Sequence, residues 1–168
     1  MAGKFEEEVW RYVYSVLDGS KPACRELKQT CQRFLDDYNS GRWDYDTTEA
    51  DYVIEKVQTQ FVHRQGEDLE GQPRKGKTLL YEPWEKFIVY GILAFYRPGT
   101  KIRRVQEAFI FIPRKNGKTL FVASLAWGLA LLSVRSGAKI YIVAASLKQA
   151  MESYDNLYNN LCTNIYAS

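Results

Sequence analysis

A glycine, a lysine and a threonine follow one another at residues 117–119, and together they could bind the phosphates of a nucleotide. Gly117 has no side chain, so the backbone at this position can approach a phosphate closely. Lys118 is placed to contact the β- and γ-phosphates, and the Thr119 hydroxyl is placed to hold Mg²⁺. The three residues therefore predict a site for ATP and Mg²⁺, provided that the surrounding chain forms the right turn.

The elements around these residues are those that a phosphate loop needs. An apolar run at 108–112 has the length and the residue types of a buried strand. Good helix formers follow from Leu120 to about Val134. A strand that delivers the loop and a helix that leaves it direct backbone N–H groups at the phosphates, together with the positive end of the helix dipole. The sequence thus predicts a phosphate loop at Pro113–Thr119, with a strand–turn–helix that merely contains these three residues as the alternative.

A second segment matches the phosphate-loop pattern G-x-x-x-x-G-K-[ST] more completely. Gly71–Thr78 fits every letter, whereas the segment that ends at Thr119 lacks the first glycine. However, Gly71–Thr78 follows a polar stretch rather than a strand, and Pro83 stands too soon after it for a long helix to begin there. We therefore interpret Gly71–Thr78 as a basic surface loop. In the other segment, Arg114 and Lys115 are expected to add the positive charge that helps to hold the phosphates.

Apolar residues at helical spacing predict three amphipathic helices in the first 63 residues, and a further helix that begins at Pro83. The second of the three is expected to begin after Ser20, with Pro22 near its first turn. The stretch 64–78 is polar and contains several glycines, so we interpret it as a linker or surface loop.

The last part of the chain, residues 108–162, has the pattern strand–loop–helix–strand–helix. Its second strand is predicted at 139–145, and Ser146 with Gln149 forms a capping box for the last helix. The predicted fold class is therefore α/β: a helical N-terminal region followed by the start of an incomplete P-loop NTPase parallel sheet. The expected division is a helical region at 1–63, a linker at 64–78 and a partial P-loop domain at 79–168.

Composition and charge limit the classes of function. Of 168 residues, 46% are hydrophobic, which is enough for one sizeable core. Three cysteines with no C-x-x-C pair and a single histidine make a zinc site improbable. The longest apolar stretch is too short to span a bilayer, and the N-terminus has no signal-peptide core, so a cytosolic protein with no membrane partner is expected.

The basic residues are concentrated in the middle of the chain. Residues 97–118 hold seven basic residues and one acid, which is where an anionic ligand is expected to bind. Within this stretch, Arg97, Lys101, Arg103 and Arg104 could follow a DNA backbone, or they could form a solvated loop that leads to the strand. The sequence leaves both interpretations open.

Three segments resemble the large terminase subunits of tailed bacteriophages. In that family the phosphate loop lacks the first glycine and carries an early arginine, and Phe111–Thr119 is similar to it. Leu80–Phe87 resembles the family's adenine motif, which has a Trp-Gln pair at the start of a helix, and Val143–Ala150 resembles the alanine-rich turn and the helix that follow the second strand. The order and spacing of the segments also match, and the resemblance covers roughly residues 79–162.

This resemblance implies an ATPase that drives double-stranded DNA into a preformed capsid in the host cytoplasm. It also implies a homo-oligomeric ring at the portal protein, with the small terminase subunit as a further partner. By the same resemblance, Lys118 and Arg114 are catalytic, Thr119 binds the metal, and Trp84 lines the adenine. The remaining cofactor-binding positions of the loop are Pro113, Lys115, Asn116 and Gly117.

The sequence departs from the family at two points. Glu85 stands where the family has glutamine, and a carboxylate can accept from the adenine amino group but cannot donate to a ring nitrogen. The alternative for Glu85 is a solvated acid that the helix dipole favours. After Lys118 the only acids are Glu152 and Asp155, so the acid that should hold Mg²⁺ at a strand end is missing, and so are the clustered carboxylates of a nuclease domain.

These departures predict one part of a longer protein that binds ATP without efficient turnover. Two other functions are left open by the residues alone. One is a helicase-like P-loop ATPase that acts on nucleic acid, and the other is a non-catalytic assembly module.

Overall fold

The computed structural model describes residues 3–67, 70–113, 115–133 and 138–165. The chain divides into two compact units that do not follow chain order. The first unit comprises Met1–Tyr52 and Tyr81–Ile110, and the second comprises Val53–Leu80 and Phe111–Ser168. The helices are α1 (Glu6–Leu17), α2 (Arg25–Asn39), α3 (Thr48–Gln60), α4 (Pro83–Leu93), α5 (Lys118–Leu131) and α6 (Leu147–Ile165).

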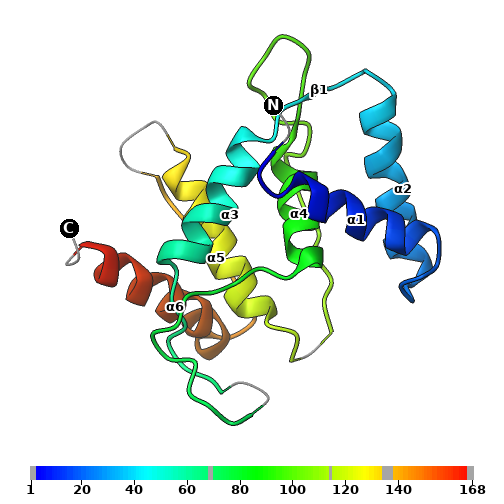
Figure 1. Ribbon diagram of the computed structural model, residues 1–168. Helices are drawn as coiled ribbons and strands as arrows, with labels where there is room; N and C mark the ends of the chain where they lie inside the picture. Colours follow the sequence, from blue (N-terminus) through cyan, green and yellow to red (C-terminus); the bar gives the residue numbers. More distant parts are fainter. Residues whose placement is uncertain (1–2, 68–69, 114, 134–137, 166–168) are drawn as a thin grey trace. The chain divides into compact units, whose positions relative to one another are not determined.

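In the first unit, α1 packs against both α2 and α4 (Figure 1). The apolar residues Val9, Val13 and Val16 recur along one face of α1, and all three are fully buried. Phe34 of α2 meets Phe87 of α4 with ring centroids 5.4 Å apart in an edge-to-face arrangement. The core of this unit is therefore formed by valines of α1 and by aromatic rings contributed by the neighbouring helices.

A short antiparallel sheet closes the first unit. Strand β1 (Asp44–Tyr45) pairs with β2 (Phe95–Tyr96), with Asp44 opposite Tyr96 and Tyr45 opposite Phe95. Because β2 follows α4 after a single residue, the pairing attaches α4 to the segment that leads from α2 into α3.

Asp51, in the first turns of α3, fastens three segments of the first unit together. Its carboxylate accepts backbone N–H groups from Lys4 at 2.8 Å and from Phe5 at 3.2 Å. It also accepts the Tyr90 hydroxyl of α4 at 2.5 Å. One carboxylate thus joins the N-terminal segment, α3 and α4.

The second unit is built on the later turns of α3 together with α5 and α6 (Figure 1). Phe61, just after α3, is fully buried and meets Trp127 of α5 at a centroid distance of 5.7 Å. Gly128 of α5 lies directly against the Val53 side chain, where a Cβ would come within 2.6 Å of a valine methyl group. The absence of a side chain at Gly128 therefore lets α3 and α5 approach closely.

Residues 62–80 of the second unit form a long hairpin-like loop, which we call the excursion. Two isolated β-bridges join its outgoing and returning arms. Val62 pairs with Thr78, and Glu67 pairs with Pro73. The fully buried Asn160 of α6 accepts the Val62 N–H at 2.6 Å and donates to the Val62 carbonyl at 3.1 Å. The side-chain amide thus satisfies the backbone of Val62 much as a strand would, and it fixes the base of the excursion.

The structure differs from the sequence-based prediction in two places. Neither 108–112 nor 139–145 forms a strand, and the sheet found in the described residues is the antiparallel pair of β1 and β2. A strand exists only when a neighbouring strand takes up its backbone hydrogen bonds, and neither segment has such a neighbour in the described chain. The second helix begins at Arg25 with Cys24 as its N-cap, so Pro22 precedes the helix instead of lying in its first turn.

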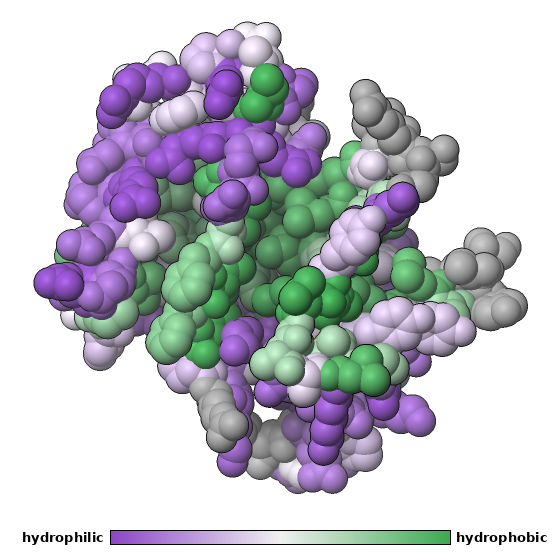
Figure 2. Space-filling model, turned by 180° about the vertical axis from the view of Figure 1, so that it is seen from behind, coloured by the Kyte–Doolittle hydropathy of each residue, from purple (hydrophilic) through white to green (hydrophobic). Residues whose placement is uncertain are grey.

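Apolar side chains of these two segments are open to solvent. Phe109 and Phe111 are 92% and 83% exposed, and Tyr141 and Val143 are 80% and 93% exposed. Exposed apolar residues, drawn green, are visible on the face displayed in Figure 2. Isolated exposed apolar residues are common, but several strongly exposed large apolar residues in each of two segments indicate surfaces that a partner could cover.

Candidate functional site

The glycine–lysine–threonine sequence lies at the beginning of α5. Gly117 is the N-cap residue with φ 70° and ψ 7°, a left-handed conformation that glycine adopts without strain. The Phe121 N–H donates to the Gly117 carbonyl at 2.9 Å, which begins the helix. Lys118 and Thr119 are consequently the first two helical residues, and their N–H groups belong to the end of the helix that attracts anions.

The residues before Gly117 form an exposed turn. Lys115 also has a positive φ of 68°, which is uncommon for a residue with a side chain. The Asn116 side-chain amide donates to the Pro113 carbonyl at 3.4 Å across the turn, and Pro113, Lys115 and Asn116 are all exposed. Arg114 lies outside the described residues. The turn therefore opens to solvent directly in front of the helix N-terminus.

The electrostatics of this turn favour an anion. The first turn of α5 contains no acidic residue, and Lys118 is exposed. Two basic residues, Lys115 and Lys118, thus flank a helix end that is itself positive. The arrangement can hold a phosphate group through backbone N–H groups and lysine charges.

The metal side of the site is less complete. In the ranges that the structure describes, no group of three or more His, Cys, Asp or Glu side chains could hold a metal ion. Two acids follow Lys118 in the sequence. Asp155 forms an ion pair with Arg64 at 2.6 Å, and Glu152 is exposed on α6. Thr119, in the first turn of α5, is the residue of this segment that could bind Mg²⁺.

Trp84 and Glu85 belong to the first unit, whereas the phosphate loop belongs to the second. Glu85 is only 6% exposed, so the interpretation of this residue as a solvated acid is wrong. Its carboxylate accepts the Glu82 backbone N–H at 2.8 Å and so caps α4. Burial raises the pKa of the Glu85 carboxyl to about 7.

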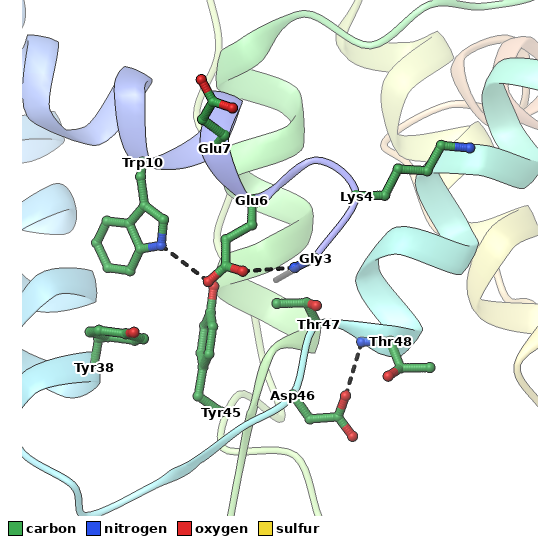
Figure 3. Close-up of a pocket in the computed structure, with 10 residues that line it drawn as sticks. All are labelled: Gly3, Lys4, Glu6, Glu7, Trp10, Tyr38, Tyr45, Asp46, Thr47 and Thr48. Atoms are coloured by element: carbon green, nitrogen blue, oxygen red, sulfur yellow. Dashed lines mark hydrogen bonds between the residues drawn. The ribbon is translucent and has the colours of Figure 1, made fainter. Parts of the chain in front are cut away.

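A surface cavity of about 1000 Å³ lies in the first unit (Figure 3). Three carboxylates line it but only one basic side chain, Lys4, and this charge balance is unfavourable for a phosphate ligand. Glu6 accepts hydrogen bonds from the Gly3 N–H at 2.8 Å and from the Trp10 indole at 3.3 Å. The cavity is therefore lined mainly by acidic and aromatic side chains, unlike the basic turn before α5. All of its lining residues precede Glu49 in the chain.

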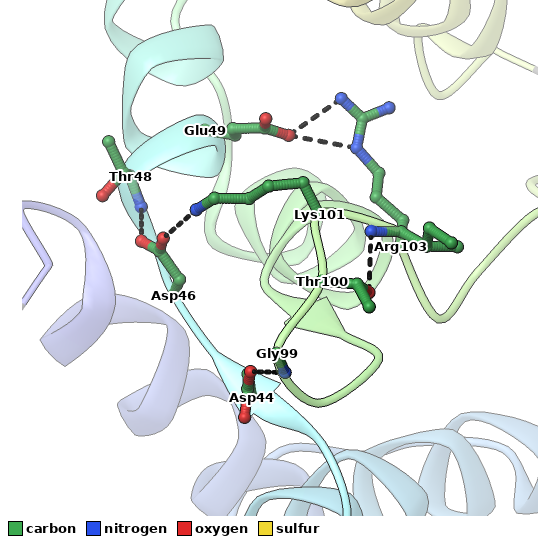
Figure 4. Close-up of polar contacts among 9 residues, drawn as sticks. Asp44, Asp46, Thr48, Glu49, Gly99, Thr100, Lys101 and Arg103 are labelled. Atoms are coloured by element: carbon green, nitrogen blue, oxygen red, sulfur yellow. Dashed lines mark hydrogen bonds and ion pairs between the residues drawn. The ribbon is translucent and has the colours of Figure 1, made fainter.

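The basic cluster that could have followed DNA is largely neutralised within the first unit (Figure 4). Lys101 pairs with Asp46 at 3.2 Å, and Arg103 makes a bidentate contact with Glu49 at 2.8 and 3.0 Å. Arg104 pairs with Asp37 at 2.7 Å, and its side chain is only 23% exposed. These ion pairs attach the loop after β2 to α2 and to the beginning of α3, although the Lys101 side chain remains 81% exposed. Whether the cluster follows DNA stays a prediction.

Sequence reasoning missed two features of the site. The left-handed conformation of Lys115 has no sequence signal, because a residue with a side chain at positive φ is not expected. The cap that Glu85 provides could have been predicted from the sequence. Glu82 stands three residues before Glu85 at the start of a helix, which is the spacing of a capping box.

Comparison with known proteins agrees with these observations. Residues 83–164 match the family model described as terminase large subunit, ATPase domain. No curated protein and no solved structure matches the chain. None of the helices in the described part of the chain combines the length and the apolar character that crossing a membrane requires. The stretch from residue 83 to residue 164 is therefore similar to the ATPase domain of terminase large subunits.

Proposed function

We propose that this chain is the ATP-binding part of a bacteriophage terminase large subunit, a motor that packages viral DNA, and that Pro113–Thr119 is its phosphate loop. The observation that carries the proposal is the exposed turn with left-handed residues at Lys115 and Gly117 that opens directly into α5. A family match over the same stretch supports it.

Each residue of the loop has a defined role in this proposal. Lys118 contacts the β- and γ-phosphates, and the Thr119 hydroxyl binds Mg²⁺. Arg114 stabilises the γ-phosphate, while Lys115 and Asn116 contribute charge and backbone N–H groups. When bound, Mg²⁺ neutralises charge on the phosphates that are to be separated.

Recognition of the adenine falls to Trp84 and Glu85 in the first turn of α4. The indole offers a flat apolar face, and Trp84 is partly exposed. A Glu85 carboxyl with a pKa of about 7 is partly protonated near neutral pH. The protonated form carries an O–H donor, which is what a ring nitrogen of adenine requires and an ionised carboxylate cannot provide.

We also propose that 108–112 and 139–145, which form no strand in this structure, become strands when further strands complete a parallel sheet. Phe109, Phe111, Tyr141 and Val143 are strongly exposed. The isoleucines next to them, Ile110, Ile112 and Ile142, are half-buried. This alternation supports the proposal, because successive side chains of a strand point to opposite faces. Parallel strands are covered on both faces and therefore consist of apolar runs. An acid at the end of such a further strand would hold Mg²⁺, so the 168-residue chain is expected to bind ATP without efficient turnover.

The partners of the intact motor follow from the same proposal. They are double-stranded DNA, the portal protein and the small terminase subunit, with several large subunits arranged as a ring in the host cytoplasm.

Titration of a fluorescent ATP analogue in the presence of Mg²⁺ tests the nucleotide site. Lys118→Ala is expected to weaken binding by at least about tenfold, which corresponds to the loss of one charge-assisted contact. The matched control is Lys77→Ala, which alters the other segment that fits the phosphate-loop pattern and should leave the affinity unchanged. Loss of binding in Lys77→Ala alone would mean that the phosphate loop is Gly71–Thr78. A steady-state ATPase rate that Lys118→Ala abolishes would refute the expectation of slow turnover.

A further inference from the structure

Two stretches of the chain are rich in basic residues, and the structure treats them differently. In the stretch from Arg97 to Arg104, Lys101 and Arg103 are ion-paired with carboxylates of the first unit (Figure 4). Arg104 pairs with Asp37 of the same unit. These carboxylates offset part of the positive charge of the stretch, and Arg97 is its one cation without an ion pair in the described residues. This stretch therefore offers an external polyanion less net positive charge than its sequence suggests.

The second basic stretch is the returning arm of the excursion at 62–80. Arg74, Lys75 and Lys77 lie on this arm, and every residue from 71 to 78 is exposed. Among the described residues, no carboxylate lies within ion-pair distance of Arg74 or Lys75. The acids of the excursion are confined to residues 67–70 in the sequence, so positive charge is concentrated on the returning arm.

The backbone holds these cations in a defined turn. The Lys77 N–H donates to the Arg74 carbonyl at 2.9 Å, and Gly76 takes the left-handed conformation, with φ 81°, that the turn requires. The Gly76 N–H donates to the His63 carbonyl at 2.8 Å, and the Arg74 N–H donates to the Gly66 carbonyl at the same distance. Arg74 and Lys77 are thus attached to a hydrogen-bonded backbone, and Lys75 lies within the turn that they close, which lowers the entropy lost when an anion binds.

The base of the excursion is equally well fastened. Arg64 pairs with Asp155 of α6 at 2.6 Å, and Asn160 of α6 bonds both backbone groups of Val62. These contacts attach the base of the excursion to α6.

We propose that Arg74 and Lys75 bind the phosphate backbone of double-stranded DNA. The inference rests on the proposed packaging function, which supplies the duplex as the polyanion. Contacts of this kind read no sequence, because lysine and arginine neutralise phosphates of any duplex and release counterions. A motor that moves along every sequence of a genome requires contacts of this class. The excursion is thus a DNA-contacting element of the second unit, distinct from the phosphate loop.

Fluorescence anisotropy with labelled duplexes of two unrelated sequences tests this proposal on the 168-residue chain. The variant Arg74→Ala/Lys75→Ala is compared with Lys28→Ala/Arg33→Ala, which removes two exposed cations of α2 and changes the net charge equally. The first variant is expected to bind both duplexes about tenfold more weakly at low salt and to reduce the slope of log K against log salt by about 2. The second variant should differ little from the unaltered chain.

Three outcomes would overturn the proposal: no duplex binding by the unaltered chain, equal loss in the two double variants, or no loss in Arg74→Ala/Lys75→Ala. The nucleotide titration, repeated on the same variants, separates this proposal from the function on which it rests. Unchanged affinity for the ATP analogue together with weakened DNA binding assigns the defect to the excursion. Absence of nucleotide binding in the unaltered chain would instead refute the proposed function.

Discussion

Replacing Gly128 by alanine is expected to destabilise the second unit, although alanine is the better helix former. An added Cβ would stand 2.6 Å from a methyl group of Val53 and 3.4 Å from two further atoms of the same side chain. Val53 is fully buried in α3, and a β-branched side chain in a helix has essentially one favoured rotamer. The clash can therefore be relieved only by moving the two helices apart.

The size of the effect follows from two opposing contributions. Overpacking of a close-packed core by one methyl group costs about 1–3 kcal/mol. Alanine in a helix interior is favoured over glycine by about 1 kcal/mol, which offsets part of this cost. The net expectation is a loss of up to about 2 kcal/mol in the free energy of unfolding.

Urea unfolding followed by circular dichroism and by tryptophan fluorescence measures this loss, and the chain contains its own control. Gly91 lies inside α4, and a Cβ there would meet nothing within 4 Å. Gly91→Ala should therefore stabilise the first unit by about 0.5–1 kcal/mol, the opposite sign. Adding Val53→Ala to Gly128→Ala should recover part of the loss, because the second change removes the methyl groups that clash.

The reasoning fails if Gly128→Ala is as stabilising as Gly91→Ala. It also fails if the effects of Gly128→Ala and Val53→Ala simply add, since two residues in direct contact must be coupled. Either result would mean that the close approach of α3 and α5 at Gly128 does not limit the packing of the second unit.

Two further predictions concern buried polar side chains. Asn160→Leu should lower the free energy of unfolding by about 2–4 kcal/mol, because both backbone groups of Val62 lose their partner; a loss below about 0.5 kcal/mol in urea unfolding would contradict this. Burial raises the pKa of the Glu85 carboxyl from its usual 4.5 to about 7 in the folded state. The folded state therefore binds the proton more tightly than the unfolded state, and the free energy of unfolding should fall as pH rises from 4.5 to about 7. Glu85→Gln should flatten this part of the stability profile, and an unchanged profile would show that another group is responsible.

Much of the local structure could be predicted from the sequence. The spacing of Val9, Val13 and Val16 predicted α1, and Pro83 correctly marked the beginning of α4. The helix after Gly117 was also predicted, with its start within two residues of the observed one at Lys118. These features depend on contacts within a few residues of one another, which a sequence displays directly.

The chemistry of the candidate site was only partly readable. The glycine–lysine–threonine sequence and the family resemblance predicted a phosphate loop at Pro113–Thr119, and the family match covers this segment. The roles of its residues stay a prediction. The left-handed turn at Lys115 and the burial of Glu85 were not expected. The conformation of Lys115 and the burial of Glu85 both depend on how the surrounding backbone folds, and neither can be predicted from the residue type alone.

By itself, the sequence determined which segments are helical and which residues could bind phosphate, because helical periodicity and the types of side chain are local properties. Only the tertiary structure decided which cations are ion-paired within the chain. Arg104 meets Asp37 and Arg103 meets Glu49 across more than fifty positions of the sequence. Arg74 and Lys75, by contrast, meet no carboxylate in the described residues. It also decided that the apolar runs at 108–112 and 139–145 do not pair in this chain. Ion pairs and strands both require a second partner that lies far away in the sequence, and folding alone determines whether that partner is brought within reach.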